Sequence, residues 1–190
     1  MPPVNRVSVA PCGRRWYDDA MTDSSATSPD DAPSPAGAVA PRLERWLRER
    51  GASFRLLEHA PVFTSEEAAR VRGTPREAGA KALVLLAQDR PVHVVLPGHR
   101  RVDNAQLRAI LGTRTLRFAT PEELLSLTGC IPGAVPPFGN LFGLPVFVDE
   151  ELAQRDEIAF NAGSNSVSIV MRCADFLRLS EARIHRLSKP

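Results

Sequence analysis

The residues best suited to do chemistry are a lysine, a cysteine and a histidine, set around a loop rich in glycine and proline. The 190-residue chain has 22 arginines but only two lysines, Lys81 and Lys189. Lys81 opens an apolar run, whereas Lys189 is one residue from the end of the chain. Because burial tunes a lysine charge more readily than an arginine charge, Lys81 is a candidate for a specific role. The alternative is that Lys81 is an ordinary residue at the start of a strand, with no functional role.

The loop is GCIPGAVPPFGNLFG, residues 129–143, with four glycines and three prolines in fifteen residues. It is too apolar for a solvated linker, so we expect a rigid, partly buried segment shaped by its backbone. Loops of this kind often line binding sites. A structural crossover between sheet edges is the alternative.

Cys130 lies in this loop, and a nucleophilic cysteine needs a nearby base. Its other interpretation, which we favour, is a small apolar filler. His59 precedes Ala60-Pro61 just before an expected helix, where a site role or a structural role is open. The chain lacks G-x-S-x-G, Walker, H-E-x-x-H and C-x-x-C motifs, so we predict no metal and no cofactor.

Composition is that of a globular chain, with 43% hydrophobic and 24% charged residues. No run approaches the ~20 apolar residues of a spanning helix, and three scattered cysteines do not indicate a disulfide framework. We therefore expect a cytoplasmic protein without a membrane partner. The net charge of +2 is too small to demand a nucleic acid and does not exclude one.

Residues 1–40 are rich in Pro, Ser, Ala and Asp, and cannot bury enough apolar surface to offset their ordering entropy. We predict a disordered N-terminal extension over 1–40 and a single domain over 41–190. Met21 could be the true start of translation, a hypothesis that the intact mass of the native protein would test.

The periodicity of residues 41–190 predicts a mixed α/β fold of the α+β type. Capping boxes predict helices after Thr64 and Thr120, and Asp103 begins another. Residues 81–87 and 92–96 indicate a hairpin, and AGSNS at 162–166 a polar turn. Helices are further expected at 42–50, 149–153 and 174–179, and strands at 53–58, 114–118, 144–148, 157–161 and 167–171, and a final strand at 183–187 is left open. We expect a largely antiparallel, barrel-like sheet of six to seven strands surrounded by short helices.

Several segments, in this order, resemble the YbaK/EbsC family of aminoacyl-tRNA deacylases, free-standing relatives of the prolyl-tRNA synthetase editing domain. They are HAPVFTSEEAARVRG (59–73), GAKALVLL (79–86), TPEELLSLTGCIPGAVPPFG (120–139), FVDEELAQ (147–154) and EIAFNAGSNSVSIVM (157–171). The G-x-x-x-P element from Gly133 to Pro137 and the lysine of G-A-K-A-L are the most specific parts. The resemblance covers residues 42–180 and implies a barrel-like sheet ringed by helices.

The family implies hydrolysis of the ester that joins a wrong amino acid to a tRNA, commonly tRNA-Pro. It places the catalytic positions at Lys81 and Gly133, where backbone N–H groups between Gly129 and Ala134 can meet an oxyanion. The remaining candidates, for substrate binding, are His59, Phe63, Gly129, Ala134, Pro137, Asn161 and Ser168. The substrate's own ribose hydroxyl or side chain is expected to assist.

Two departures leave the specificity open. Ala82 follows the lysine where the alanine-editing branch has Asn and the cysteine-editing branch Thr, and Ser168 stands where the latter has Asp. Expected partners are mischarged tRNA-Pro, with prolyl-tRNA synthetase or an elongation factor to present it, and no DNA. Arginines at 70, 72, 76, 100 and 101 could flank an acceptor stem. The protein is expected to be a monomer or weak homodimer. The alternatives are a catalytically silent tRNA- or synthetase-binding module and a Cys130 hydrolase.

Overall fold

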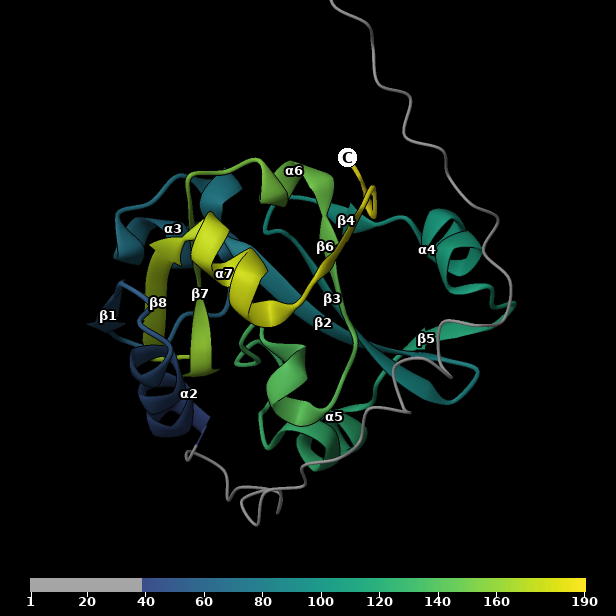
Figure 1. The fold of residues 1–190 in the computed structure, drawn as a ribbon, viewed down its shortest axis with the longest axis horizontal. Coiled ribbons are helices and arrows are strands. Elements are labelled where there is room, and N and C mark those ends of the chain that lie inside the picture. Colours follow the sequence, from purple (N-terminus) through teal and green to yellow (C-terminus); the bar gives the residue numbers. More distant parts are fainter. Residues whose placement is uncertain (1–38) are drawn as a thin grey trace, which may run out of the picture.

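A computed structural model describes residues 39–190, which form six α-helices and ten strands (Figure 1). The helices are α2 (Val39–Glu49), α3 (Ser65–Arg72), α4 (Asn104–Leu111), α5 (Pro121–Thr128), α6 (Glu150–Ala153) and α7 (Cys173–Ser180), with 3-10 turns η1 (Arg76–Ala78) and η2 (Gly139–Phe142). The strands are β1 (Phe54–Glu58), β2 (Ala80–Ala87), β3 (Arg90–Pro97), β4 (Arg101–Val102), β5 (Leu116–Phe118), β6 (Val146–Asp149), β7 (Glu157–Ser164), β8 (Val167–Arg172), β9 (Arg183–His185) and β10 (Ser188–Lys189).

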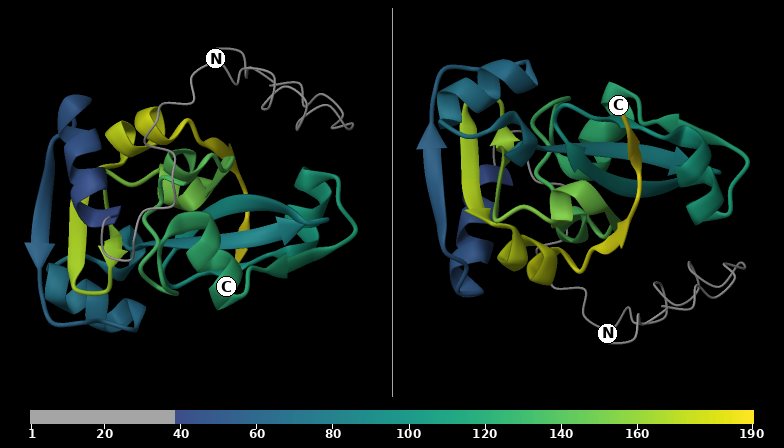
Figure 2. Two further views of the ribbon diagram at one scale, coloured as in Figure 1. Left: turned by 90° about the horizontal axis from the view of Figure 1, so that it is seen from below. Right: turned by 90° about the horizontal axis from the view of Figure 1, so that it is seen from above.

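The strands are arranged in three sheets, ordered β5-β2-β3-β6-β9, β1-β8-β7 and β10-β4. The predicted β2–β3 hairpin is confirmed, and β6 and β9 add to it in parallel. Figure 2 shows the three-stranded sheet on one side of the molecule and the long hairpin reaching toward the other.

The predicted mixed α/β fold is confirmed, but the predicted barrel is not shown. Within residues 39–190 the hydrogen-bonded strands remain in separate sheets, joined by one isolated bridge between Gly79 and Ala159. The strand count also exceeds the prediction. Strands β4 and β10 have two residues each, which is too short to leave a periodic pattern in the sequence.

Local capping signals fixed the helix ends as the sequence predicted. Thr64 and Thr120 each form a complete capping box, and the Asp103 carboxylate accepts from the Ala105 and Gln106 amides. The helices after these caps end at glycines in the left-handed conformation, such as Gly73. Interactions of this kind depend on only three or four consecutive residues, so they are readable before any tertiary contact is known.

Two predicted boundaries were wrong for tertiary reasons. Helix α2 begins at Val39, inside the predicted disordered extension, because its side chain is buried beside Gly163. The rest of that extension, with Met21, lies outside the described residues. Strand β7 runs to Ser164 through an irregularity after Asn161. Of the turn predicted over 162–166, only residues 165–166 therefore form a turn.

Phe138 anchors the glycine- and proline-rich loop to the main core. Its ring is fully buried and makes edge-on contacts with Trp46 at 5.4 Å, Phe160 at 5.7 Å and Phe176 at 5.4 Å between centroids. These partners come from α2, β7 and α7, so the loop is tied to both layers that flank it. The expected rigid, partly buried loop is thus present.

His93, on β3, gives a prediction about acid stability. The ring is fully buried, and burial lowers its pKa to about 3, whereas an unfolded histidine titrates near 6.5. Below pH 6.5 the unfolded chain therefore binds one more proton than the folded chain, and stability falls as the pH decreases toward 3. We expect His93→Leu to remove up to ~1.4 kcal/mol per pH unit from the slope of the unfolding free energy.

Urea denaturation between pH 7 and pH 4 measures this slope, and His185→Leu, at a half-buried histidine, is the control. The slope, rather than the absolute stability, is compared because the substitution also alters packing. Equal slopes for wild type and His93→Leu would contradict the assignment of His93 as the main histidine responsible.

Candidate active site

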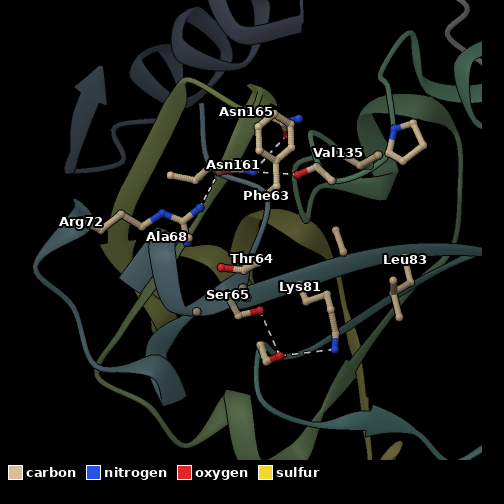
Figure 3. Close-up of a pocket in the computed structure, with 17 residues that line it drawn as sticks. Phe63, Thr64, Ser65, Ala68, Arg72, Lys81, Leu83, Val135, Asn161 and Asn165 are labelled. Carbon is tan, nitrogen blue, oxygen red and sulfur yellow. Dashed lines mark hydrogen bonds between the residues drawn. The ribbon is translucent and has the colours of Figure 1, made fainter. Parts of the chain in front are cut away.

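A cavity of about 250 Å³ lies where the two larger sheets meet, and it brings together segments far apart in sequence. Its walls come from the start and inner face of α3, the start of β2, the loop residue Gly98, the loop residues Pro132, Gly133 and Val135, and the end of β7 with the turn that follows. In Figure 3, Asn161, Asn165 and Val135 lie toward one end, and Lys81 and Ser65 toward the other.

Lys81 lines this cavity as the second residue of β2, where it pairs with Leu96 of β3. Its ammonium donates to the carbonyl oxygens of Arg100 at 2.6 Å and Gly98 at 3.4 Å. Burial, and then the neighbouring charge of Arg101, lower the pKa of Lys81. No acidic group contributes to that shift, so the ammonium is held by neutral oxygens alone.

Gly133 also lines the cavity, and its amide and that of Val135 are the lining amides of this loop that donate no hydrogen bond within residues 39–190. The amides of Gly129, Cys130 and Ala134 are already bonded, to the Leu125 carbonyl, the Thr128 hydroxyl and the Ile131 carbonyl. The Gly133 amide donates no hydrogen bond within residues 39–190. Its φ of +83° is one that glycine adopts without strain.

Two of the predicted substrate-binding residues line the cavity. Phe63 is 80% exposed at the start of α3, and Asn161 donates from its side-chain amide to the Gly133 carbonyl at 2.7 Å. Two others, Ser168 and His59, do not line the cavity but lie next to Asn161 and to each other. Ser168 is fully buried, and its hydroxyl lies 3.3 Å from the Asn161 Oδ1 atom and 2.7 Å from the His59 Nε2 atom.

The remaining predicted residues do not line the cavity. Gly129 is the C-cap of α5, and Ala134 is fully buried with its carbonyl bonded to the Gly163 amide. Pro137 lies beyond Val135, the last residue of the loop that lines the cavity. Cys130 is buried outside the lining, and burial raises the pKa of its thiol to about 11, so the structure gives no support to a cysteine nucleophile.

The sequence analysis missed the importance of Arg72, which it grouped with surface arginines. Arg72 is 8% exposed and lines the cavity from the last turn of α3. A signal was available, because Arg72 is four residues from the small, buried Ala68 and three from Ala69, on one helix face. Of the other arginines grouped with it, Arg76 pairs with Glu66 and Arg100 with Glu151.

The chain belongs to the aminoacyl-tRNA editing domain family, whose model matches residues 59–179. The matched segment contains every lining element just described, from the start of α3 to the end of β7.

Relatives with this domain include whole editing proteins and parts of synthetases. The chain is 38% identical over 148 residues to the Multifunctional Ser/Thr-tRNA deacylase ProXp-y of Escherichia coli (strain K12), covering 75% of this chain and 89% of the relative. It is 28% identical to the Prolyl-tRNA editing protein ProX of Acetoanaerobium sticklandii, covering 72% and 87%. A solved structure named "Crystal structure of a putative trans-editing enzyme for prolyl tRNA synthetase" superposes with a TM-score of 0.73 at 28% identity, over 84% of this chain and 100% of that one.

The burial of the two described cysteines gives a prediction. Burial raises the pKa of both Cys130 and Cys173 to about 11, and each is 1% exposed. We expect iodoacetamide at pH 7.5 to leave both unmodified in the native protein and to alkylate both in urea, as mass spectrometry of their peptides would record. Native alkylation of Cys130 together with loss of deacylation would instead restore the cysteine mechanism.

Proposed function

We propose that this protein is a trans-editing hydrolase that cleaves the ester of a mischarged aminoacyl-tRNA. One observation carries the proposal: Gly133, whose amide makes no hydrogen bond within residues 39–190, and Lys81, whose ammonium is partly desolvated, line the same cavity. An activated ester needs no strong protein nucleophile, so a site without a reactive cysteine suits this reaction. The names of the relatives, all tRNA deacylases or editing proteins among those described, support it.

In the proposed reaction, water attacks the carbonyl carbon of the ester and the bond to the ribose oxygen breaks. The products are the free amino acid and a tRNA with its terminal hydroxyl restored. Negative charge develops on the former carbonyl oxygen, where the Gly133 amide would donate a hydrogen bond. Lys81 would leave its two carbonyl partners to hold the terminal ribose-phosphate or the carbonyl region. One proton of the attacking water would pass, with a substrate hydroxyl as relay, to the departing ribose oxygen, which becomes the restored terminal hydroxyl.

We further propose a hydroxylated amino acid, serine or threonine, as the group removed. Thr64, Ser65, Asn161 and Asn165 place hydroxyl and amide groups in the wall, and these can pair with a substrate hydroxyl. Polar walls of this kind disfavour an apolar side chain, because their groups would be left unpaired. The E. coli relative, named as a Ser/Thr-tRNA deacylase, supports the same class.

The carrier in this proposal is tRNA-Pro, presented by prolyl-tRNA synthetase or an elongation factor in the cytoplasm. Arg70 and Arg101, unlike Arg76 and Arg100, form no ion pair within residues 39–190 and remain available to phosphates.

None of the helices between residues 39 and 190 has the length and apolar character needed to span a bilayer.

A second candidate is a catalytically silent tRNA- or synthetase-binding module. One observation favours it: the Lys81 ammonium is bonded to the carbonyls of Gly98 and Arg100 rather than offered to the cavity. The two functions differ in a single measurement, because only the hydrolase consumes aminoacyl-tRNA.

The first test is a deacylation screen with the full-length protein. It is incubated with tRNA-Pro charged with Ser, Thr, Ala, Cys or Pro, and the remaining aminoacyl-tRNA is counted. We expect loss of the Ser and Thr species with Pro-tRNA spared. Because Lys81 meets developing charge or the adjoining phosphate, Lys81→Ala should lower the rate by ~10²-fold or more.

Lys189→Ala is the matched control, since it removes the only other lysine, which does not line the cavity. A wild-type rate in Lys81→Ala would contradict the proposed role of the lysine. If wild type left every charged tRNA-Pro and other charged tRNAs intact, binding without hydrolysis would favour the silent module.

The role of the Gly133 backbone can be separated from general strain. Alanine at Gly133, with φ of +83°, and at Gly112, with φ of +61°, should both destabilise the fold by ~1 kcal/mol. Only Gly133→Ala should also lower the deacylation rate, because a shifted loop moves the donor from the oxyanion. Thermal unfolding and single-turnover deacylation of both variants check this. Equal rates would rule out a precise requirement at Gly133.

A further inference from the structure

Arg72 is a buried cation without a carboxylate partner. No ion pair within residues 39–190 includes it, and burial alone lowers its pKa, to about 10. The side chain therefore stays charged at neutral pH in a largely dehydrated place at the cavity wall. Burying such a charge is costly, so its hydrogen-bond partners must be specific.

Those partners are all neutral oxygens on β7 and β8. Arg72 donates from Nε to the Ser168 hydroxyl at 2.9 Å, from one terminal nitrogen to the Ala159 carbonyl at 3.3 Å, and from the other to the Asn161 Oδ1 atom at 2.5 Å. A guanidinium has five donors and no acceptor, so these three contacts hold its plane against the two strands.

The contact with Asn161 determines which way that amide faces. Asn161 Oδ1 points at Arg72, so Nδ2 points at the Gly133 carbonyl, 2.7 Å away (Figure 3). The flipped amide would set its donor against a guanidinium donor and its oxygen against a carbonyl oxygen, losing both bonds. Arg72 thereby dictates that Asn161 donates to Gly133.

The Ser168 hydroxyl, which accepts from Arg72 Nε, is itself oriented by His59. His59 Nδ1 lies 2.8 Å from the Ala60 carbonyl, so in the neutral ring this nitrogen carries the proton and Nε2 accepts. The Ser168 hydroxyl can then donate to His59 Nε2 while accepting from Arg72 Nε. This explains how two predicted residues outside the wall still bear on it.

We propose that Arg72 is a positioning residue for the deacylation reaction, acting through Asn161 on Gly133. The Gly133 carbonyl is held by Asn161, and the amide of the same peptide group, that of Ala134, is held by the Ile131 carbonyl. With that peptide fixed from both sides, the adjoining peptide between residues 132 and 133, which carries the unbonded Gly133 amide, has less freedom to turn, so that the amide can meet the proposed oxyanion. This inference rests on the proposed function, and it predicts an effect on kcat rather than on tRNA affinity.

The kinetic test compares Arg72→Met, Arg72→Lys, Asn161→Ala and the Arg72→Met/Asn161→Ala double variant on Ser-tRNA-Pro. We expect each single variant to lower kcat about 10- to 100-fold with KM within twofold, in the range seen when one oxyanion donor is lost. The double variant should be no worse than the poorer single variant, because both break one chain of contacts. Arg72→Lys should recover little, since an ammonium cannot replace the planar fork.

Arg45→Met is the matched control, because Arg45 is exposed on α2, lies outside the cavity lining and should leave kcat unchanged. A raised KM with unchanged kcat in Arg72→Met, or losses that multiply in the double variant, would overturn the proposal and indicate direct binding of a substrate anion. If Arg72→Met does not fold, Asn161→Ala carries the same comparison.

A second measurement does not depend on activity. The Gly133 amide resonance, read by ¹H–¹⁵N NMR, should shift in Arg72→Met and in Asn161→Ala, and stay in place in Arg45→Met. An unshifted resonance in both variants would overturn the chain of contacts. A wild type inactive on every charged tRNA would refute the proposed function, while the resonance would still report on the contacts.

Discussion

The site depends on the meeting of two sheets where Gly79, just before β2, lies beside Ala159 of β7. This bridge sets the start of β2, with Lys81, against the strand that carries Asn161. The Ala159 carbonyl also accepts from Arg72, so α3 is bonded to the same point. A cavity results because three backbone segments converge there while the loop around Gly133, anchored by Phe138, closes the fourth side.

The charged side chains that line this cavity are all positive. Lys81 and Arg72 both line it, and both make their hydrogen bonds to neutral oxygens instead of carboxylates. Positive charge left without a counter-ion in a partly dehydrated site favours a ligand that brings or develops negative charge. A tetrahedral intermediate next to a tRNA phosphate does both, which connects the electrostatics of the wall to the proposed chemistry.

Neither of the two cysteines within residues 39–190 has a lowered pKa, which fits a site that acts through backbone amides. Cys130 lies in the same loop as Gly133, but it is buried and its pKa is raised. In the proposed reaction this loop therefore contributes the backbone amide of Gly133 rather than the Cys130 side chain. Catalysis of this kind depends on where an amide points, and hence on the contacts that hold the loop. The ring of Phe138 and the amide of Asn161 fix that loop from the core side and the cavity side.

The sequence by itself determined what short-range interactions decide. Capping residues such as Thr64, Asp103 and Thr120 set helix ends, alternation set the β2–β3 hairpin, and the rarity of lysine singled out Lys81. Tertiary structure alone decided that the sheets remain separate, that the Gly133 amide stays unbonded, and that Arg72 is buried. The reason is physical: these outcomes rest on strand pairings and side-chain contacts between residues far apart in the sequence, such as Phe54 and Met171 or Arg72 and Ser168, which no local pattern records.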